Sequence, residues 1–259
     1  MATQALVTGA SAGIGRAFAV ALAARGHDLV LVARREASLT EVASTLEAEH
    51  GASSEVLVAD LETDDGVARV AARLADPHRP VDLLVNNAGF GTSGTFWELD
   101  VDREEAEIQV NVVALVRLTH AALGAMVGRN RGGVINLSSV AGYQPTPWGA
   151  TYGATKAFVS SFTHALREEL RGTDVRMMVL APGYTRSEFH QRAHMDVAQL
   201  PELLWASAEK VAEAGLRAYD RDRAVCVPGP LNAAAAAFAG SLPAGVTRRV
   251  AGLITRRTH

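Results

Sequence analysis

Short apolar runs that alternate with longer segments of helical period constrain the fold of this 259-residue chain more than any other feature. The runs are rich in Val, Leu and Ile, and each ends near Gly, Asn, Asp, Ser or Pro. They lie at residues 5–7, 29–32, 56–58, 83–85, 134–137, 177–180 and 225–227. Continuous apolar strands of this kind are buried on both faces, as in parallel sheets. The alternation therefore predicts a single α/β domain, a doubly wound seven-stranded parallel sheet of Rossmann type.

The segments between these runs carry apolar residues at i, i+3, i+4 and i+7. One such face contains Ile108, Val112, Leu115 and Leu118, and a second contains Phe158, Phe162 and Leu166. Apolar stripes at this spacing typically face the core.

Composition excludes several classes of protein. A formal net charge of −3 gives no electrostatic reason to expect a nucleic-acid partner, and a single cysteine, Cys226, excludes an internal disulfide framework or a cysteine-based zinc site. Polar residues Thr3, Gln4 and Thr8 interrupt the first apolar stretch, so it does not read as a signal peptide. Gly, Pro and polar residues also break every long apolar stretch, which makes a membrane span unexpected. We expect a cytoplasmic protein.

Two regions break the alternation. Residues 186–206 separate the sixth run from the next helix by far more than a usual connection, and long loops of this kind are often lids or binding loops. Residues 231–259 form a basic C-terminal extension, which carries four arginines between positions 248 and 257 and no acidic residue. A basic amphipathic helix can lie on an anionic membrane surface, but a subunit contact or a solvated helix is the commoner outcome.

The sequence TGASAGIG at residues 8–15 follows the first predicted strand and opens the first helix. Glycines there permit a tight turn and let the backbone approach a pyrophosphate, which would lie at the positive end of the helix. An ordinary strand-to-helix turn is the alternative. The same letters also match a G-x-S-x-G nucleophile elbow, but that motif needs several strands and an oxyanion loop before its serine, and ten residues cannot supply them.

A second motif places Tyr152 and Lys156 four residues apart, with Ser139 thirteen residues before the tyrosine. Side chains at i and i+4 share a helix face, so the ammonium can lie near the phenol. A cation about 5 Å away lowers a tyrosine pKa by about two units, from about 10 to about 8. Ser139 ends the fifth predicted strand, at the edge where α/β sheets bind ligands. A surface Tyr-x-x-x-Lys on an amphipathic helix is the structural alternative.

Together these residues resemble the short-chain dehydrogenase/reductase family, and the resemblance runs from residue 4 to about residue 230. It implies that Asn111, Ser139, Tyr152 and Lys156 form a catalytic tetrad. Tyr152 would be the acid or base, Ser139 would orient the substrate, and Lys156 would bind the nicotinamide ribose. Asn111 would interrupt helical bonding and hold a water. The cofactor-binding residues that it implies, besides Tyr152 and Lys156, are Gly9, Ser11, Gly13, Ile14, Gly15, Arg34, Asp60, Leu61, Asn87, Ala88, Gly89, Pro182, Gly183, Thr185 and Ser187.

The end of the second predicted strand indicates which dinucleotide binds. Members that use NAD carry an acidic residue there, which accepts a hydrogen bond from the ribose 2′-hydroxyl. Here the position is Ala33, followed by Arg34 and Arg35. A guanidinium is well shaped to bind a 2′-phosphate. Position 12, where many NADP enzymes carry another basic residue, is alanine, so the prediction of NADP(H) rather than NAD(H) depends mainly on Arg34.

The resulting prediction is an oxidoreductase that transfers a hydride between NADP(H) and a small-molecule carbonyl or secondary alcohol. The resemblance implies a homodimer or homotetramer, formed through the helices that carry Asn111 and Tyr152. A non-catalytic dinucleotide sensor, or an enzyme of the same family that catalyses epimerisation or dehydration, stays open. His190, His194 and Asp196 form a weak metal-ligand pattern, but solvated histidines on a polar lid are the commoner outcome, and we expect no metal site. Several aromatic or large residues suit a pocket wall, with ordinary packing as the alternative: Tyr143, Trp148, Tyr184, Phe189, Met195 and Trp205.

Overall fold

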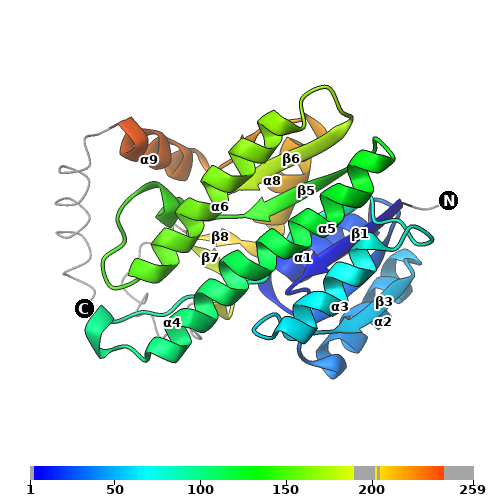
Figure 1. Ribbon diagram of the computed structural model, residues 1–259, viewed down its shortest axis with the longest axis horizontal. Helices are drawn as coiled ribbons and strands as arrows, with labels where there is room; N and C mark the ends of the chain where they lie inside the picture. Colours follow the sequence, from blue (N-terminus) through cyan, green and yellow to red (C-terminus); the bar gives the residue numbers. More distant parts are fainter. Residues whose placement is uncertain (1–2, 190–201, 203–204, 242–259) are drawn as a thin grey trace.

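A parallel sheet runs through the centre of the protein, as Figure 1 shows for the computed structural model, which describes residues 3–189, 202 and 205–241. Its seven strands follow the order β3-β2-β1-β4-β5-β6-β9, and every neighbouring pair is parallel. Their bounds are β1 Thr3–Thr8, β2 His27–Ala33, β3 Ser54–Val58, β4 Leu83–Asn86, β5 Gly132–Leu137, β6 Val175–Leu180 and β9 Val225–Cys226. The predicted doubly wound sheet is confirmed.

Helices cover both faces of the sheet, and each face has its own core. On one face lie α1 (Gly13–Ala23), α2 (Glu36–His50) and α8 (Ala208–Asp220), whose core includes the fully buried Phe18. On the other lie α3 (Asp64–Ala75), α5 (Leu115–Gly128) and α6 (Ala150–Glu169), around Leu118 and Met126. The strands between these layers are apolar on both sides because both of their faces are covered.

One long helix runs along the second face in three parts: α4 (Val101–Ile108), a π-helical turn η2 (Gln109–Ala114) and α5. By length and composition this 28-residue helix could cross a membrane, contrary to the expectation that no segment qualifies. Within its most apolar window 44% of the residues are buried inside the fold. One side of this helix, with Leu118 and Met126, packs against the sheet and α3, and apolar residues such as Ile108 and Val127 are exposed on the other side.

The prediction of which face of α6 is buried was only partly right, since Leu166 packs against the core and Phe162 is half-buried, but Phe158 is exposed. Phe158 is 41% exposed and stacks on Phe162, with ring centroids 5.6 Å apart. Ile108, expected on the core side of α4, is 43% exposed. The buried face of α6 is largely polar instead: Gly153, Thr155, Lys156, Val159, Ser160 and Thr163. The apolar stripe therefore runs along the border of the buried face, from the exposed Phe158 to the core-packed Leu166.

Buried hydrogen bonds explain why a polar helix face can pack on the sheet. The Ser138 hydroxyl donates to the Lys156 carbonyl over 2.7 Å and lies 2.8 Å from the Ser160 hydroxyl. The Asn136 amide donates to Thr163 Oγ1 over 3.0 Å, and Asn86 Nδ2 donates to Asn136 Oδ1 over 2.9 Å. Buried polar groups with partners fix a unique register, because misplacement would leave them unsatisfied. These bonds therefore hold α6 in one position relative to β5.

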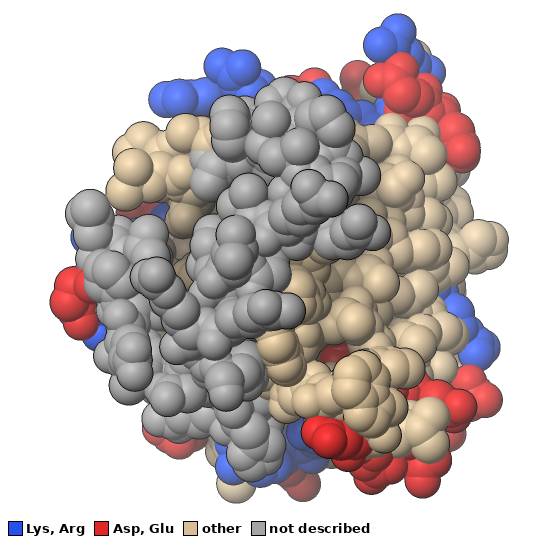
Figure 2. Space-filling view, turned by 90° about the vertical axis from the view of Figure 1, so that its left-hand side faces the viewer, with Lys and Arg blue, Asp and Glu red and all other residues tan. Residues whose placement is uncertain are grey.

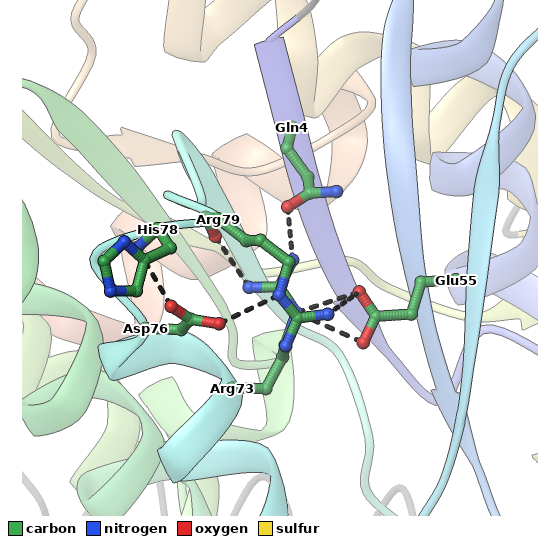
Figure 3. A network of polar contacts seen from close by, with 6 residues as sticks. All are labelled: Gln4, Glu55, Arg73, Asp76, His78 and Arg79. Carbon is green, nitrogen blue, oxygen red and sulfur yellow. Dashed lines mark hydrogen bonds and ion pairs between the residues drawn. The ribbon is translucent and has the colours of Figure 1, made fainter.

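At the opposite edge of the sheet a buried arginine joins α3 to β1 and β3 (Figure 3). The Arg73 side chain is 3% exposed, and its Nε lies 2.9 Å from Glu55 Oε2. Its other nitrogens donate to Gln4 Oε1 and to the carbonyl of Arg79. Because the planar guanidinium donates hydrogen bonds in several directions at once, Arg73 connects β1, β3 and the loop after α3.

The part of the chain between β6 and α8 contains structure that the sequence did not predict. Strand β7 (Thr185–Arg186) pairs in parallel with β8 (Ala206–Ser207), which brings together the two ends of the predicted lid at 186–206. Residues 190–201 and 203–204 lie outside the described residues, as do His190, His194, Met195 and Asp196. Of the predicted extension at 231–259, helix α9 (Pro230–Ser241) is described, and residues 242–259 are not.

Candidate active site

The turn after β1 forms a narrow backbone cradle. Gly9 and Gly13 have φ of +67° and +52°, which favours glycine. A β-carbon on Gly9 would lie 2.8 Å from Asn87 Nδ2, and one on Gly15 would lie 2.2 Å from the Gly9 carbonyl oxygen. Helix α1 begins at Gly13, and its N-cap Ala12 makes no side-chain cap. The first amides of α1 are thus available to an anion, and the turn fits a dinucleotide pyrophosphate.

Residues at the end of β4 brace this turn. Asn87 Nδ2 donates to the Thr8 carbonyl over 2.8 Å. The Thr8 hydroxyl accepts hydrogen bonds from the backbone amides of Asn87 and Ala88, over 3.0 and 2.9 Å. These bonds fix the predicted Asn87-Ala88-Gly89 segment beside the glycine turn, so the two predicted cofactor-binding segments meet in the structure.

The ends of β2 and β3 hold the residues predicted for the adenosine half of the cofactor. Leu61 is buried, and the Asp60 carboxylate accepts the Glu62 amide over 3.0 Å. Arg34 is exposed and pairs with Glu62 over 3.0 Å. Glu62 also lies 3.4 Å from Arg103, whose guanidinium lies over the Phe90 ring. Glu62 was not predicted, and it places a negative charge directly on the arginine expected to read a 2′-phosphate.

Three predicted catalytic residues converge beside Gly89 and the end of β5. Ser139 lies two residues after β5 and caps the short helix η3 (Val140–Tyr143), accepting the Ala141 amide over 3.2 Å. Lys156 Nζ lies 5.6 Å from the Tyr152 ring centroid and donates to the Leu137 carbonyl over 3.0 Å. A β-carbon on Gly89 would lie 3.4 Å from Lys156 Nζ and 2.7 Å from Asn111 Oδ1. Lys156 and Asn111 therefore approach the same glycine.

The protonation of this group differs from the sequence-based prediction. Burial raises the pKa of Tyr152 to about 12, with a lowering contribution from the Ser139 hydroxyl and a raising one from Glu107. Burial also lowers the pKa of Lys156 to about 8, partly opposed by Glu107. The predicted phenol pKa near 8 was wrong, because desolvation of the phenolate outweighs attraction to an ammonium that faces the Leu137 carbonyl. Tyr152 is a neutral phenol at pH 7.

Asn111 lies in the π-helical turn of the long helix, as expected for a residue that interrupts helical bonding. Its side chain donates to the Phe90 carbonyl over 2.8 Å and to Thr155 Oγ1 over 3.1 Å, and it accepts from the Phe90 amide. Asn111 thus ties the loop after β4 to α6. Its side chain is fully engaged in positioning these elements.

Residues after β6 close the site on its far side. Thr185 is buried and donates to the Gly183 carbonyl, and Ser187 Cβ would lie 3.0 Å from a β-carbon on Gly13. The predicted Pro182–Ser187 stretch therefore reaches across the glycine turn. The Phe189 ring lies 5.4 Å from the Tyr152 ring, which makes it a wall of the site. Asn232 of α9 packs on Gly183, so the C-terminal helix supports this loop.

Two buried glutamates were missed by the sequence analysis. Glu104 is 5% exposed and Glu107 is fully buried, one turn apart on α4. Both contact Thr92, and Glu104 also contacts Thr151. A signal was present, because Glu107 precedes Asn111 by four residues and so shares its helix face.

Known proteins match this chain in sequence and in structure. Residues 3–198 match the family described as short chain dehydrogenase. A sulfoacetaldehyde reductase from Chromohalobacter salexigens is 40% identical over 186 residues, 71% of this chain and 73% of that protein. An NADP-dependent 3-hydroxy acid dehydrogenase from Schizosaccharomyces pombe is 35% identical over 188 residues, 71% of this chain and 72% of that protein. A short-chain dehydrogenase from Sphingobium yanoikuyae, solved in complex with NADPH, has a TM-score of 0.84 at 35% identity, covering 93% and 96% of the two chains.

Proposed function

The chain belongs to the short-chain dehydrogenase family, and on that premise we propose that it is an NADP(H)-dependent carbonyl reductase with Tyr152 as its acid and base. Oxidoreductases of this family act on alcohol and carbonyl groups of small molecules with NAD(P). The observation that carries the finer proposal is a half-buried Tyr152 that has the buried Lys156 and Ser139 beside it near the end of β5.

The chemistry assigned to each residue follows from its protonation. Tyr152, whose pKa is about 12, is a proton donor at neutral pH and suits the reductive direction. Ser139, at the carboxyl edge of the sheet, orients the substrate oxygen through its hydroxyl. When bound, the dinucleotide supplies the hydride. Gly9, Gly13, Asn87 and Lys156 would hold it, since their backbone and side chains form the cradle described above.

Support for NADP(H) over NAD(H) comes from Arg34. The side chain extends from the end of β2, where a carboxylate would favour an unphosphorylated ribose. Two relatives support this choice, since the Schizosaccharomyces pombe dehydrogenase is named NADP-dependent and the Sphingobium structure contains NADPH, whereas a similar Burkholderia phymatum structure contains NAD. Because Arg34 pairs with Glu62, the preference for NADPH over NADH depends both on the attraction of Arg34 for a 2′-phosphate and on the opposing charge of Glu62.

A screen of aldehydes, ketones, steroids and acyl derivatives tests the activity, with NADPH and NADH compared for every substrate reduced. We expect a higher kcat/KM with NADPH, and a loss of at least about a hundredfold in kcat for Tyr152→Phe. Oxidation of neither cofactor by any carbonyl would favour a dinucleotide sensor. Turnover by Tyr152→Phe at the rate of the unmodified protein would remove Tyr152 from its role.

We further propose that the protein forms a homodimer or homotetramer through α4, α5 and α6. Ile108, Val113 and Phe158 are exposed apolar residues on these helices. In Figure 2 a broad region of the described surface beside the grey residues carries few charged side chains. Burial of such a surface against a second copy removes apolar area from water.

A further inference from the structure

A pair of buried carboxyls lies next to the proposed catalytic residues without a role in the chemistry described so far. Glu107 Oε2 accepts the Thr92 amide over 2.8 Å and lies 3.0 Å from the Thr92 hydroxyl. The same hydroxyl contacts Glu104 Oε1, and the Thr151 hydroxyl contacts Glu104 Oε2. Thr92 follows the stretch in which Gly89 faces Lys156 and Gly91 faces the Tyr152 ring. The carboxyl pair is thus one short loop away from the tyrosine and the lysine.

The number of hydrogen-bond donors around Thr92 indicates that Glu104 and Glu107 share one carboxyl proton. A threonine hydroxyl donates one hydrogen bond, yet Thr92 Oγ1 lies against an oxygen of each carboxyl. One of these contacts is a good hydrogen bond only if the carboxyl itself carries a proton and donates it. Two buried carboxylates this close also repel each other, which favours a singly protonated pair.

The two carboxyls differ in what they face. Both Glu104 oxygens are occupied by threonine hydroxyls. Glu107 Oε1 is buried and has no hydrogen-bond partner among the residues that the structure describes. The charged and titratable groups that act on Glu107 are Glu104 on its own helix and Lys156 and Tyr152 on α6. Glu107, and not Glu104, acts on the pKa values of those two residues.

We propose that Glu107 is a proton reservoir for the active site, which returns to Tyr152, by way of Lys156, the proton that the phenol gives to the substrate. The inference rests on the proposed function. In this role Glu107 does not touch the substrate. It is a positioning residue, which affects the reaction only through Lys156 and Tyr152.

The step balances as follows. Reduction breaks the Tyr152 O–H bond and forms the O–H bond of the alcohol, which leaves a phenolate. An N–H proton of the Lys156 ammonium passes to the phenolate, and the carboxyl proton of Glu107 passes to the resulting amine. Water then reprotonates the Glu107 carboxylate, so each turnover consumes one proton from solvent. Burial raises the pKa of Tyr152 to about 12, well above those of Lys156 and Glu107, so the phenolate is the strongest base of the three and draws the proton toward itself.

Infrared difference spectroscopy on the full chain tests the protonated carboxyl without any turnover. We expect a carboxyl C=O band that titrates near pH 7, well above an ordinary glutamic acid. The band should be lost in Glu107→Gln and kept in Glu105→Gln, which removes an exposed carboxylate two residues away on α4. The titration of the carboxyl band in the unmodified protein tests the proposal even if Glu107→Gln does not fold. Absence of a carboxyl titrating in this range would overturn the proposal.

The pH dependence of kcat for carbonyl reduction gives the second readout. In the unmodified protein and in Glu105→Gln we expect kcat to fall as pH rises through about 7, because the reservoir empties. Glu107→Gln should lack that inflection and lower kcat at least about threefold below pH 7, with KM for the substrate within about twofold. An unchanged profile, or a change in substrate KM alone, would refute the proposal. Failure of the proposed function is distinct, since it would abolish NADPH oxidation in the unmodified protein as well.

Discussion

The balance between Arg34 and Glu62 yields a cofactor prediction in which two substitutions act in opposite directions. Arg34→Asp should invert the preference from NADPH toward NADH, because it replaces the attraction for a 2′-phosphate with repulsion. Glu62→Gln should strengthen the preference, because it frees Arg34 from a carboxylate 3.0 Å away. Both changes lie at the exposed ends of β2 and β3 and leave the core intact.

The expected changes in kcat/KM can be estimated from the solvent exposure of the Arg34–Glu62 ion pair. The Arg34 side chain is 58% exposed, so its bond to Glu62 contributes about 0–1 kcal/mol. A charge-assisted bond to a phosphate contributes about 1.5–3 kcal/mol, of which release from Glu62 consumes a part. We therefore expect Arg34→Ala to lower kcat/KM for NADPH about 5- to 50-fold, and Glu62→Gln to raise it by up to about fivefold. The values for NADH should stay within about twofold, since a ribose hydroxyl carries no charge.

The assay is kcat/KM for NADPH and NADH with one reducible carbonyl at fixed ionic strength, because salt screens exposed charges. Arg171→Ala is the matched control: Arg171 is also exposed and paired with a glutamate, Glu168, at the far end of α6. It should change neither cofactor's value. An unaltered NADPH-to-NADH ratio in Arg34→Asp, or weaker use of NADPH by Glu62→Gln, would refute the electrostatic reasoning.

Four further predictions follow from single contacts. Gly9→Ala should weaken NADPH binding at least about tenfold by calorimetry, because its β-carbon would meet Asn87, whereas Gly26→Ala, equally strained with nothing within 4 Å, should not. Arg73→Met should lower the free energy of unfolding in urea by about 2–4 kcal/mol, since it removes the buried donor of Gln4 Oε1 and of the Arg79 carbonyl and leaves Glu55 paired only with the exposed Arg79, while the exposed Arg69→Met should cost less than about 1 kcal/mol. Phe158→Asp should produce monomers in light scattering with an unchanged circular dichroism spectrum; an intact oligomer would place the interface elsewhere. The stabilisation linked to Glu107 is present below its ordinary pKa of 4.5 and is lost as pH rises through about 7, so the unmodified protein should lose roughly 2–3 kcal/mol more stability than Glu107→Gln over that range in urea titrations.

The sequence was most informative where backbone chemistry is local. Runs of apolar residues predicted the strands of the main sheet, because a strand buried on both faces needs no polar positions. The glycine turn was predictable for a similar reason, since positive φ at Gly9 and Gly13 restricts the residue type. The strands β7 and β8 were missed, because two-residue pairs have too little sequence to show a period.

Burial of side chains was harder to predict. The stripe of Phe158, Phe162 and Leu166 has the helical period of a core face, yet Phe158 is exposed. The core side of α6 instead uses Ser160 and Thr163, whose partners on β5 cannot be identified without the fold. Glu107 was missed for the same reason, because a glutamate on a helix is usually solvated, and its partner Thr92 cannot be identified without the fold.

One physical cause, burial, sets the protonation of Tyr152, Lys156 and Glu107. Desolvation disfavours the charged form, so it raises the pKa of the two acids and lowers that of the base. A lysine about 5 Å from the phenol in an effective dielectric of about 20 would bring the phenol pKa near 8, where much of the phenol would be ionised and unable to donate as pH rises. In this site the phenol stays protonated, and the lysine and the glutamic acid are brought to within about one pKa unit of each other. Thr92, whose amide donates a hydrogen bond to Glu107, and the Phe189 ring, which packs on Tyr152, contribute to this desolvation, so we expect a substitution at either position to affect proton transfer before it affects cofactor binding.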